Sequence, residues 1–283
     1  MIRFATQNDL NGIISLWNEA FGDSEEDIMF FLDNRFIPEN TLVYEYCGEV
    51  VSMLFLLEGN MVINGNKYPS YYLYAACTAK KCRGRGIMAE LLEKAKSVGA
   101  ERDRCFICLM PGEKSLFEFY ERFGYKTVFS RKILKVNLSD LSKIEKSINN
   151  LFFCDYYSKR KNAFSDYNRF EWDNNAIEFA CKSNSLYNGR ERNNRKGYAL
   201  YMIDLSDLYV KEFAFNKSDF NDELNSLLIE SNCKNAVLFL PSEYPTDIGE
   251  LKIEPSAMAV AVKPEFDSLI SELTDAYLGL TLD

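Results

Sequence analysis

The chain has 283 residues, 47% of them hydrophobic and 27% charged, a composition typical of a folded globular protein with one large or two small domains. Its formal net charge of -9 repels phosphate backbones, so nucleic acid is not expected as a partner. The chain has no histidine, which excludes histidine-activated nucleophiles, histidine metal ligands and histidine acid-base catalysis. It also lacks an apolar signal core and any apolar run of membrane-spanning length, so we expect a cytoplasmic protein without membrane contact.

The first half alternates strand-like and helix-like patterns. Alternating or continuous apolar runs predict strands at residues 2–5, 41–46, 50–57, 71–78, 105–110 and 125–136. Apolar residues at helical spacing predict helices over residues 10–21, 25–32, 87–98 and 116–123. Ser24 is placed to cap the second helix, and Gly124 to end the fourth. This order predicts a mixed α/β (α+β) fold.

The pattern of the second half is weaker but has the same kind of order. It predicts helices at 177–187 and 220–229, and strands at 198–203, 208–215, 236–240 and 258–262. The order strand, strand, helix, strand repeats part of the first half, so we infer a second copy of the same fold, although residue identity between the halves is too weak for a detectable repeat. Polar residues 137–150 are the predicted linker.

Cysteines raise the question of a metal site. Cys105 and Cys108 form a C-x-x-C pair, and Cys77 and Cys82 could supply two more thiolates for zinc. Residues 105–110 have the pattern of a strand, however, in which positions i and i+3 point to opposite faces. We therefore expect structural cysteines and no metal.

One loop has the composition of a phosphate-binding site. Residues 78–88 read Thr-Ala-Lys-Lys-Cys-Arg-Gly-Arg-Gly-Ile-Met and stand between a predicted strand and a predicted helix. Glycine allows close approach of the backbone, and the first turn of a helix offers unpaired N–H groups and partial positive charge. Taken alone, the loop would favour a tight strand-to-helix turn that carries a solvated basic face.

The order of residues in this loop resembles the pyrophosphate loop of the GNAT superfamily of N-acetyltransferases, R/Q-x-x-G-x-G/A. The six positions are occupied by Arg83, Gly84, Arg85, Gly86, Ile87 and Met88. Met88 departs from the usual small residue, as in the enhanced-intracellular-survival branch of these enzymes and its bacterial relatives. Further on, residues 119–125, Phe-Tyr-Glu-Arg-Phe-Gly-Tyr, look like the helix end that supplies the proton donor in many GNAT enzymes, here Tyr120.

The resemblance implies a fold, a domain division and a cofactor. It implies a GNAT domain with a central mixed sheet over residues 1–136, which would bind acetyl-CoA and carry catalysis. Residues 137–283 would be a degenerate GNAT-like domain lining the substrate cleft, without the third domain of larger members. That half lacks the phosphate-binding loop, because residues 216–219 read Asn-Lys-Ser-Asp without glycine. Its basic cluster is interpreted as a solvated loop; the cluster comprises Arg190, Arg192, Arg195 and Lys196.

The resemblance also implies roles for single residues. Backbone groups of Cys77, Thr78 and Ala79 would pair with the pantetheine arm and polarise the thioester carbonyl, and N–H groups of residues 83–88 would hold the pyrophosphate. Tyr120 suits the acid role, because a phenol with a pKa of ~10 stays protonated at neutral pH. The general base stays open between Glu58, a water chain and the terminal carboxylate of Asp283.

The sequence thus predicts an acetyl-CoA-dependent N-acetyltransferase acting on a primary amine of a small, cationic molecule or peptide. Two alternatives remain open. One is an acyl-CoA-binding regulator that has lost catalysis. The other is a transferase that takes aminoacyl groups from charged tRNA, which the acidic composition and the intact pyrophosphate loop disfavour.

Overall fold

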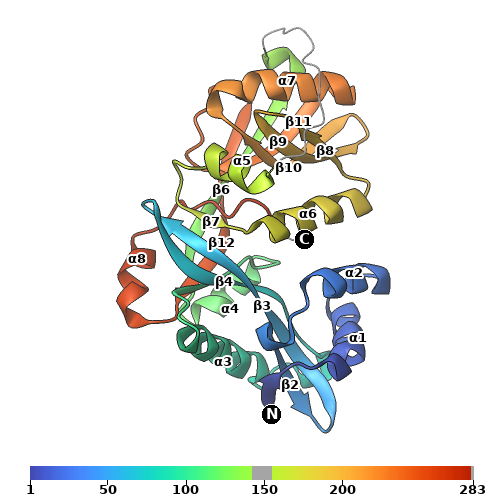
Figure 1. Ribbon diagram of the computed structural model, residues 1–283, viewed down its shortest axis with the longest axis vertical. Helices are drawn as coiled ribbons and strands as arrows, with labels where there is room; N and C mark the ends of the chain where they lie inside the picture. The colour runs from blue at the N-terminus through green and yellow to red at the C-terminus, as the bar shows by residue number, and fades with distance from the viewer. Residues whose placement is uncertain (142–154, 282–283) are drawn as a thin grey trace. The chain divides into compact units, whose positions relative to one another are not determined.

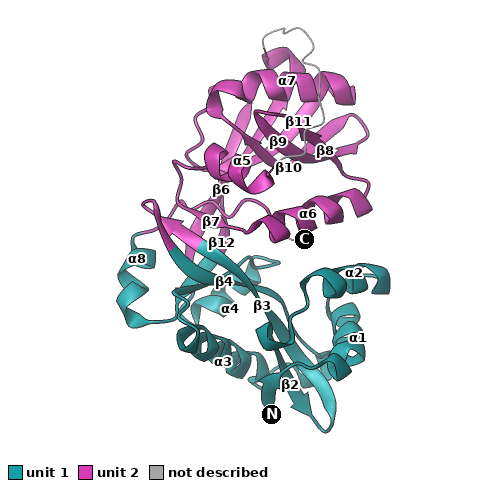
Figure 2. Cartoon of the chain, viewed as in Figure 1, with its two compact units in different colours: residues 1–60, 68–126, 258–272 teal, residues 61–67, 127–257, 273–283 magenta. Residues whose placement is uncertain are grey.

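The computed structural model describes residues 1–141 and 155–281 (Figure 1). The chain packs into two compact units, each assembled from separate segments (Figure 2). Unit 1 comprises Met1–Asn60, Tyr68–Lys126 and Met258–Glu272, and unit 2 comprises Met61–Lys67, Thr127–Ala257 and Leu273–Asp283. These packing units cut the chain differently from the predicted division at residues 136 and 137, which stays a prediction.

Unit 1 is built on a mixed sheet. Its strands are neighbours in the order β1 (Ile2–Phe4), β2 (Thr41–Tyr46), β3 (Glu49–Ile63), β4 (Asn66–Thr78), β5 (Phe106–Leu109) and β12 (Glu250–Ala261). The pairs β1–β2, β2–β3 and β5–β12 are antiparallel, and β4–β5 is parallel. Only the last residues of β12, Met258 to Ala261, pair with β5, so unit 1 takes one strand from near the end of the chain.

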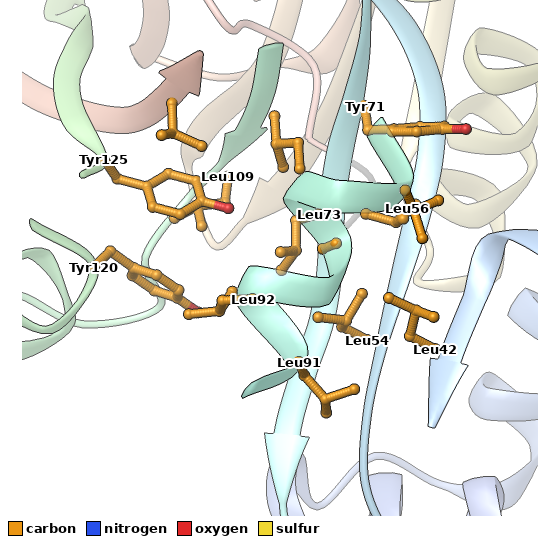
Figure 3. Packing of buried hydrophobic residues seen from close by; sticks show 14 of the residues in the cluster. Leu42, Leu54, Leu56, Tyr71, Leu73, Leu91, Leu92, Leu109, Tyr120 and Tyr125 are labelled. Carbon is orange, nitrogen blue, oxygen red and sulfur yellow. The ribbon is translucent and has the colours of Figure 1, made fainter. Parts of the chain in front are cut away.

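Helices pack on this sheet through buried side chains. They are α1 (Leu10–Phe21), α2 (Glu25–Arg35), α3 (Ile87–Glu101), α4 (Ser115–Glu121) and α8 (Asp267–Ser271). Ser24 caps α2 as predicted, because its hydroxyl accepts the N–H of Asp27 at 3.1 Å. Leu91 and Leu92 of α3 pack with Leu54 of β3 and Leu73 of β4 in one buried cluster (Figure 3). This cluster fixes α3, and hence the loop that leads into it, against the sheet.

Unit 2 holds the remaining strands of the same mixed sheet, together with helices of its own. Its strands are neighbours in the order β12, β6 (Lys126–Asn137), β11 (Asn235–Pro241), β10 (Asp207–Phe215), β9 (Gly197–Asp204) and β8 (Arg190–Asn193). Its helices are α5 (Tyr156–Ala163), α6 (Asn174–Leu186) and α7 (Phe220–Ser231), and it also contains a short strand, β7 (Arg169–Glu171). As in unit 1, a parallel pair, β10–β11, lies beside antiparallel neighbours. The predicted mixed α/β fold is confirmed.

The halves also share a short stretch of sequence that is visible once the strands are aligned. β5 leads into residues 109–113, Leu-Met-Pro-Gly-Glu, and β11 leads into residues 239–243, Phe-Leu-Pro-Ser-Glu. Each of the two strands is the parallel partner of the strand that precedes a long helix. A repeat too weak to detect in the sequence alone is thus recovered by topology.

The basic cluster of the second half was predicted to be a solvated loop, and the structure differs from this prediction. Residues 190–193 form β8, and Arg192 is fully buried. Its guanidinium donates to Glu223 at 2.8 Å and to Glu230 at 2.6 Å, both on α7. The prediction was wrong for Arg192, because α7 brings carboxylates to β8 that lie more than 30 residues away in the chain.

Within the described residues, no helix is both long and apolar enough to cross a membrane.

Candidate functional site

Strands β4 and β5 pair over only a short length and then separate. Their parallel register covers Ser70 to Tyr72 on β4, opposite Phe106 to Cys108 on β5. β4 continues to Thr78 without a β5 partner in the described register. Ala75, in the middle of this unpaired part, has a φ of 47°, in the left-handed region that residues with a Cβ seldom adopt. The backbone of β4 is therefore irregular at this point, and beyond Tyr72 the edge of the strand that faces β5 has no partner in the described register.

The end of β4 is fixed by one serine on β3. The Ser52 hydroxyl donates to the carbonyl oxygen of Cys77 at 2.7 Å and lies 2.8 Å from the hydroxyl of Thr78. The N–H of Ala79 donates to the Val51 carbonyl at 2.8 Å. Because this N–H already donates within the chain, it is not available to bind the pantetheine arm, which is the role that the sequence had predicted for the backbone of Ala79.

The following loop leaves a run of backbone donors open. After a 3-10 turn over Lys80–Cys82, Gly84 and Gly86 take φ values of 75° and 79°, and a Cβ at either would meet nothing within 4 Å. The first bond of α3 runs from the N–H of Glu90 to the carbonyl of Gly86 at 3.1 Å. Within the described residues, the N–H groups of residues 84–89 have no acceptor. Open space above glycine and consecutive free N–H groups at a helix N-terminus form an anion-binding site.

The cations of this loop are not equally free. Lys81 is ion-paired with Glu49 at 2.5 Å, and Nε of Arg83 donates to the Thr78 carbonyl at 3.0 Å, which folds that side chain back over the loop. Lys80 and Arg85 are exposed, and no carboxylate of the described residues pairs with them. Two exposed cations thus flank the open N–H groups, and both favour an anionic ligand.

Tyr120 of α4 is buried close to the end of β4. Its ring stacks edge to face on Tyr125 at 5.6 Å between centroids, and it points towards Leu92 of α3 (Figure 3). Burial, together with the nearby Cys77 thiol, raises the pKa of Tyr120 to about 12. Burial likewise raises the pKa of the Cys77 thiol to about 12. The structure thus brings two predicted site residues, Cys77 and Tyr120, into one poorly solvated environment.

Glu58, one candidate for the general base, is not brought to this place. Glu58 lies on β3, where its carboxylate accepts from Arg104 at 2.5 Å. It stands six residues from Ser52, or roughly 20 Å along an extended strand. Asp283 lies outside the described residues.

Sequence reasoning missed three residues that shape the site. Ala75 supplies the turned backbone, Ser52 fixes the end of β4, and the Glu19 carboxylate on α1 accepts the N–H of Lys80 at 2.6 Å. None of the three carries a local signal, because each acts through a partner on another element.

Comparison with known proteins shows similarity in sequence for part of the chain and in fold for nearly all of it. Residues 1–128 match the family model of the acetyltransferase (GNAT) domain. No curated protein matches the sequence. A solved GCN5-related N-acetyltransferase from Anabaena variabilis ATCC 29413 aligns with a TM-score of 0.76 over 93% of this chain and 73% of that one, at 12% identity.

Two further solved structures bear on the second half. Eis1 from Mycobacterium abscessus aligns with a TM-score of 0.70 over 93% of this chain and 74% of its own, at 12% identity. A tandem GNAT protein from the clavulanic acid biosynthesis pathway aligns with a TM-score of 0.52 over 93% of this chain and 99% of its own, also at 12% identity. These alignments reach well beyond residue 128, so the predicted GNAT fold followed by a second GNAT-like half is confirmed.

Proposed function

We propose that the chain is an acetyltransferase of the GNAT type, which transfers the acetyl group of acetyl-CoA to a primary amine of a small, cationic molecule or peptide. The observation that carries this proposal is the run of open N–H groups at residues 84–89, next to exposed Arg85 and Lys80. Such a site fits a pyrophosphate, which needs many donors and close approach of the backbone.

The residues of the loop fit acetyl-CoA. Gly84 and Gly86 leave room for phosphate oxygens where any side chain would intrude, and α3 points the positive end of its dipole at the same place. The separation of β4 from β5 offers backbone groups of Ala75 to Thr78 to an extended ligand arm. Acetyl-CoA, when bound, supplies an activated acyl group as a thioester. The chain's task is to hold it, exclude water and handle protons.

Tyr120 is proposed as the proton donor to the leaving thiolate. In water a thiolate is a weaker base than a phenolate, with thiol pKa values near 8.5 against 10, so the transfer would be uphill. The Cys77 thiol shows what this environment does to a thiol, because burial raises the pKa of both Cys77 and Tyr120 to about 12. A thiolate that leaves in the same surroundings is matched to Tyr120, and proton transfer between matched groups is efficient.

A cationic acceptor is supported by charge on the first two helices. α2 begins with Glu25, Glu26 and Asp27, and α1 ends in exposed Glu19 and Phe21. Together with the net charge of -9, this acidic region attracts cations and repels acidic amines. An exposed aromatic ring beside carboxylates is a suitable surface for an ammonium group.

Residues 1–136 are proposed as the catalytic, acetyl-CoA-binding domain and residues 137–283 as a non-catalytic copy. The proposal requires one acetyl-CoA per chain. Isothermal titration calorimetry with acetyl-CoA alone is expected to give a stoichiometry of one, and a value of two would contradict a non-catalytic second copy.

A thiol-release assay over a panel of amines tests the activity itself. We expect release of CoA thiol with polyamines, aminoglycosides or basic peptide N-termini. Tight acetyl-CoA binding without release on any amine would instead indicate an acyl-CoA-binding regulator. Absence of acetyl-CoA binding would leave the aminoacyl-tRNA-dependent alternative to be tested with charged tRNA.

A further inference from the structure

Unit 2 has a sheet face that no helix of the described residues covers completely. On β9 and β10, α5 covers this face at Tyr198 and at Glu212, through a ring contact at 5.2 Å and the Arg160–Glu212 ion pair at 3.0 Å. Further along the strands the same face holds a cross-strand row that runs from β9 to β6, which we call the open row. It consists of Met202, Tyr209, Val237 and Lys135, paired in that order by the strand register.

The three apolar residues of the open row are accessible. Tyr209 is 39% exposed, and Met202 and Val237 are only half-buried, in contrast to the buried Leu208 and Leu238 on the opposite face. At the turn between β9 and β10, Leu205 is 97% exposed. Aromatic, methionine and aliphatic side chains on a sheet face that the described residues leave uncovered are typical of protein interfaces.

The two ends of this face carry opposite charge. Asp204 is exposed on β9, two residues from Met202 and therefore on the same face. Lys135 is exposed at the other end, on β6. The ends are three strand spacings apart across the sheet, about 14 Å, and two residues apart along the strands. A two-fold axis lying along the strands between β10 and β11 would place β9 of one copy over β6 of another, so that each acidic end meets a basic end.

We propose that the open row is the interface of a symmetric homodimer. In it, Tyr209 of each copy packs on Val237 of the second copy, and Asp204 of each copy pairs with Lys135 of the second copy. A two-fold dimer needs a self-complementary surface. The open row supplies this, because its apolar centre lies across the axis and its charges exchange ends under the rotation.

Sedimentation velocity over a dilution series of the full chain tests the proposal. The wild-type chain is expected to be a dimer. Tyr209→Asp, which buries a charge at the interface centre, is expected to raise the dimer dissociation constant at least about 100-fold. Tyr46→Asp is the matched control, because Tyr46 is a strand tyrosine in unit 1 with 51% exposure, and it should leave the dimer unchanged. Circular dichroism verifies that both variants remain folded.

Charge exchange tests the proposed arrangement independently of apolar packing. Asp204→Lys alone and Lys135→Glu alone are each expected to weaken the dimer about tenfold, since each leaves like charges facing one another. Combining both substitutions in one chain is expected to restore dimerisation. A wild-type chain that stays monomeric, a dimer that tolerates Tyr209→Asp, or failure of the double variant to recover would overturn the proposal.

Discussion

The strands β4 and β10, each of which has a parallel partner, lead into loops that begin alike and differ in length. After β4 comes the 3-10 turn Lys80–Cys82, then residues 83–86, and only then α3 at Ile87. After β10 the 3-10 turn Lys217–Asp219 is followed directly by α7 at Phe220. The segment that unit 2 lacks contains both positive-φ glycines and both arginines of the unit 1 loop.

The N-terminus of α7 is also filled and charged in the opposite sense. Phe220 is buried there, with ring contacts to Phe213 at 5.3 Å and to Tyr244 at 5.2 Å. Asp222 and Glu223 stand in the first turn of α7. A helix dipole is present in both units, so the dipole alone does not make an anion site. Open N–H groups, room for the ligand and cations are needed as well, and only the loop of unit 1 combines them.

The largest effect is expected from a substitution that fills the open space in the residue 83–88 loop of unit 1. Gly86→Val places a branched side chain in the open space and in a backbone conformation with φ 79°. Loss of two charge-assisted hydrogen bonds to phosphate, each worth about 1.5–3 kcal/mol, should weaken acetyl-CoA binding about 10³-fold. Calorimetry measures the affinity.

The backbone strain of that variant needs its own control. Gly65→Val introduces the same side chain at φ 78°, also with nothing within 4 Å, in the turn between β3 and β4. It is expected to lower thermal stability by a similar amount while keeping acetyl-CoA affinity. Equal affinity losses in both variants would mean that the residue 83–88 loop does not bind the pyrophosphate.

Removing the proton donor should separate turnover from binding. Tyr120→Phe keeps the buried ring and its contact with Tyr125, so acetyl-CoA affinity should hold while kcat falls about 10²-fold. Tyr125→Phe is the matched control, because its buried hydroxyl has no partner within the described residues. If both variants keep full turnover, the acid lies elsewhere.

The pH profile should report the buried environment of Tyr120. With a cationic amine, kcat/KM is expected to rise up to about tenfold per pH unit below the pKa of the amine, because only the free amine attacks. The donor works in its neutral form, and burial raises the pKa of Tyr120 to about 12, so the profile should stay flat above the amine pKa. A decline centred near pH ~10, the ordinary phenol value, would show that the donor is solvated.

Salt should have the smallest effect. Steering by the acidic first helices acts through solvent, so kcat/KM for cationic amines is expected to fall about threefold when ionic strength is raised past the physiological range. A neutral amine of similar size serves as the reference and should change little. If kcat/KM for cationic amines does not change with ionic strength, or if acidic amines are preferred, the electrostatic part of the substrate proposal is wrong.

Local sequence determined much of this protein. The helix that begins after Ser24, the glycine loop of residues 83–88 and the helix that carries Tyr120 were all predictable, because capping, positive φ and helical spacing depend on residues a few positions apart. The missing loop in the second half was visible for the same reason, since an absence of glycine between residues 216 and 219 needs no knowledge of the fold.

Tertiary structure alone decided which strands meet and which groups become buried. Met258 to Ala261 of β12 pair with β5, β4 leaves β5 after Tyr72, and Ala75 takes a positive φ beyond that point. Arg192 became a buried ion-pair partner rather than a solvated side chain, because α7 supplies carboxylates from a distant part of the sequence. Strand partners and burial are set by contacts between residues far apart in the chain, and those contacts leave no periodic pattern in the amino-acid sequence.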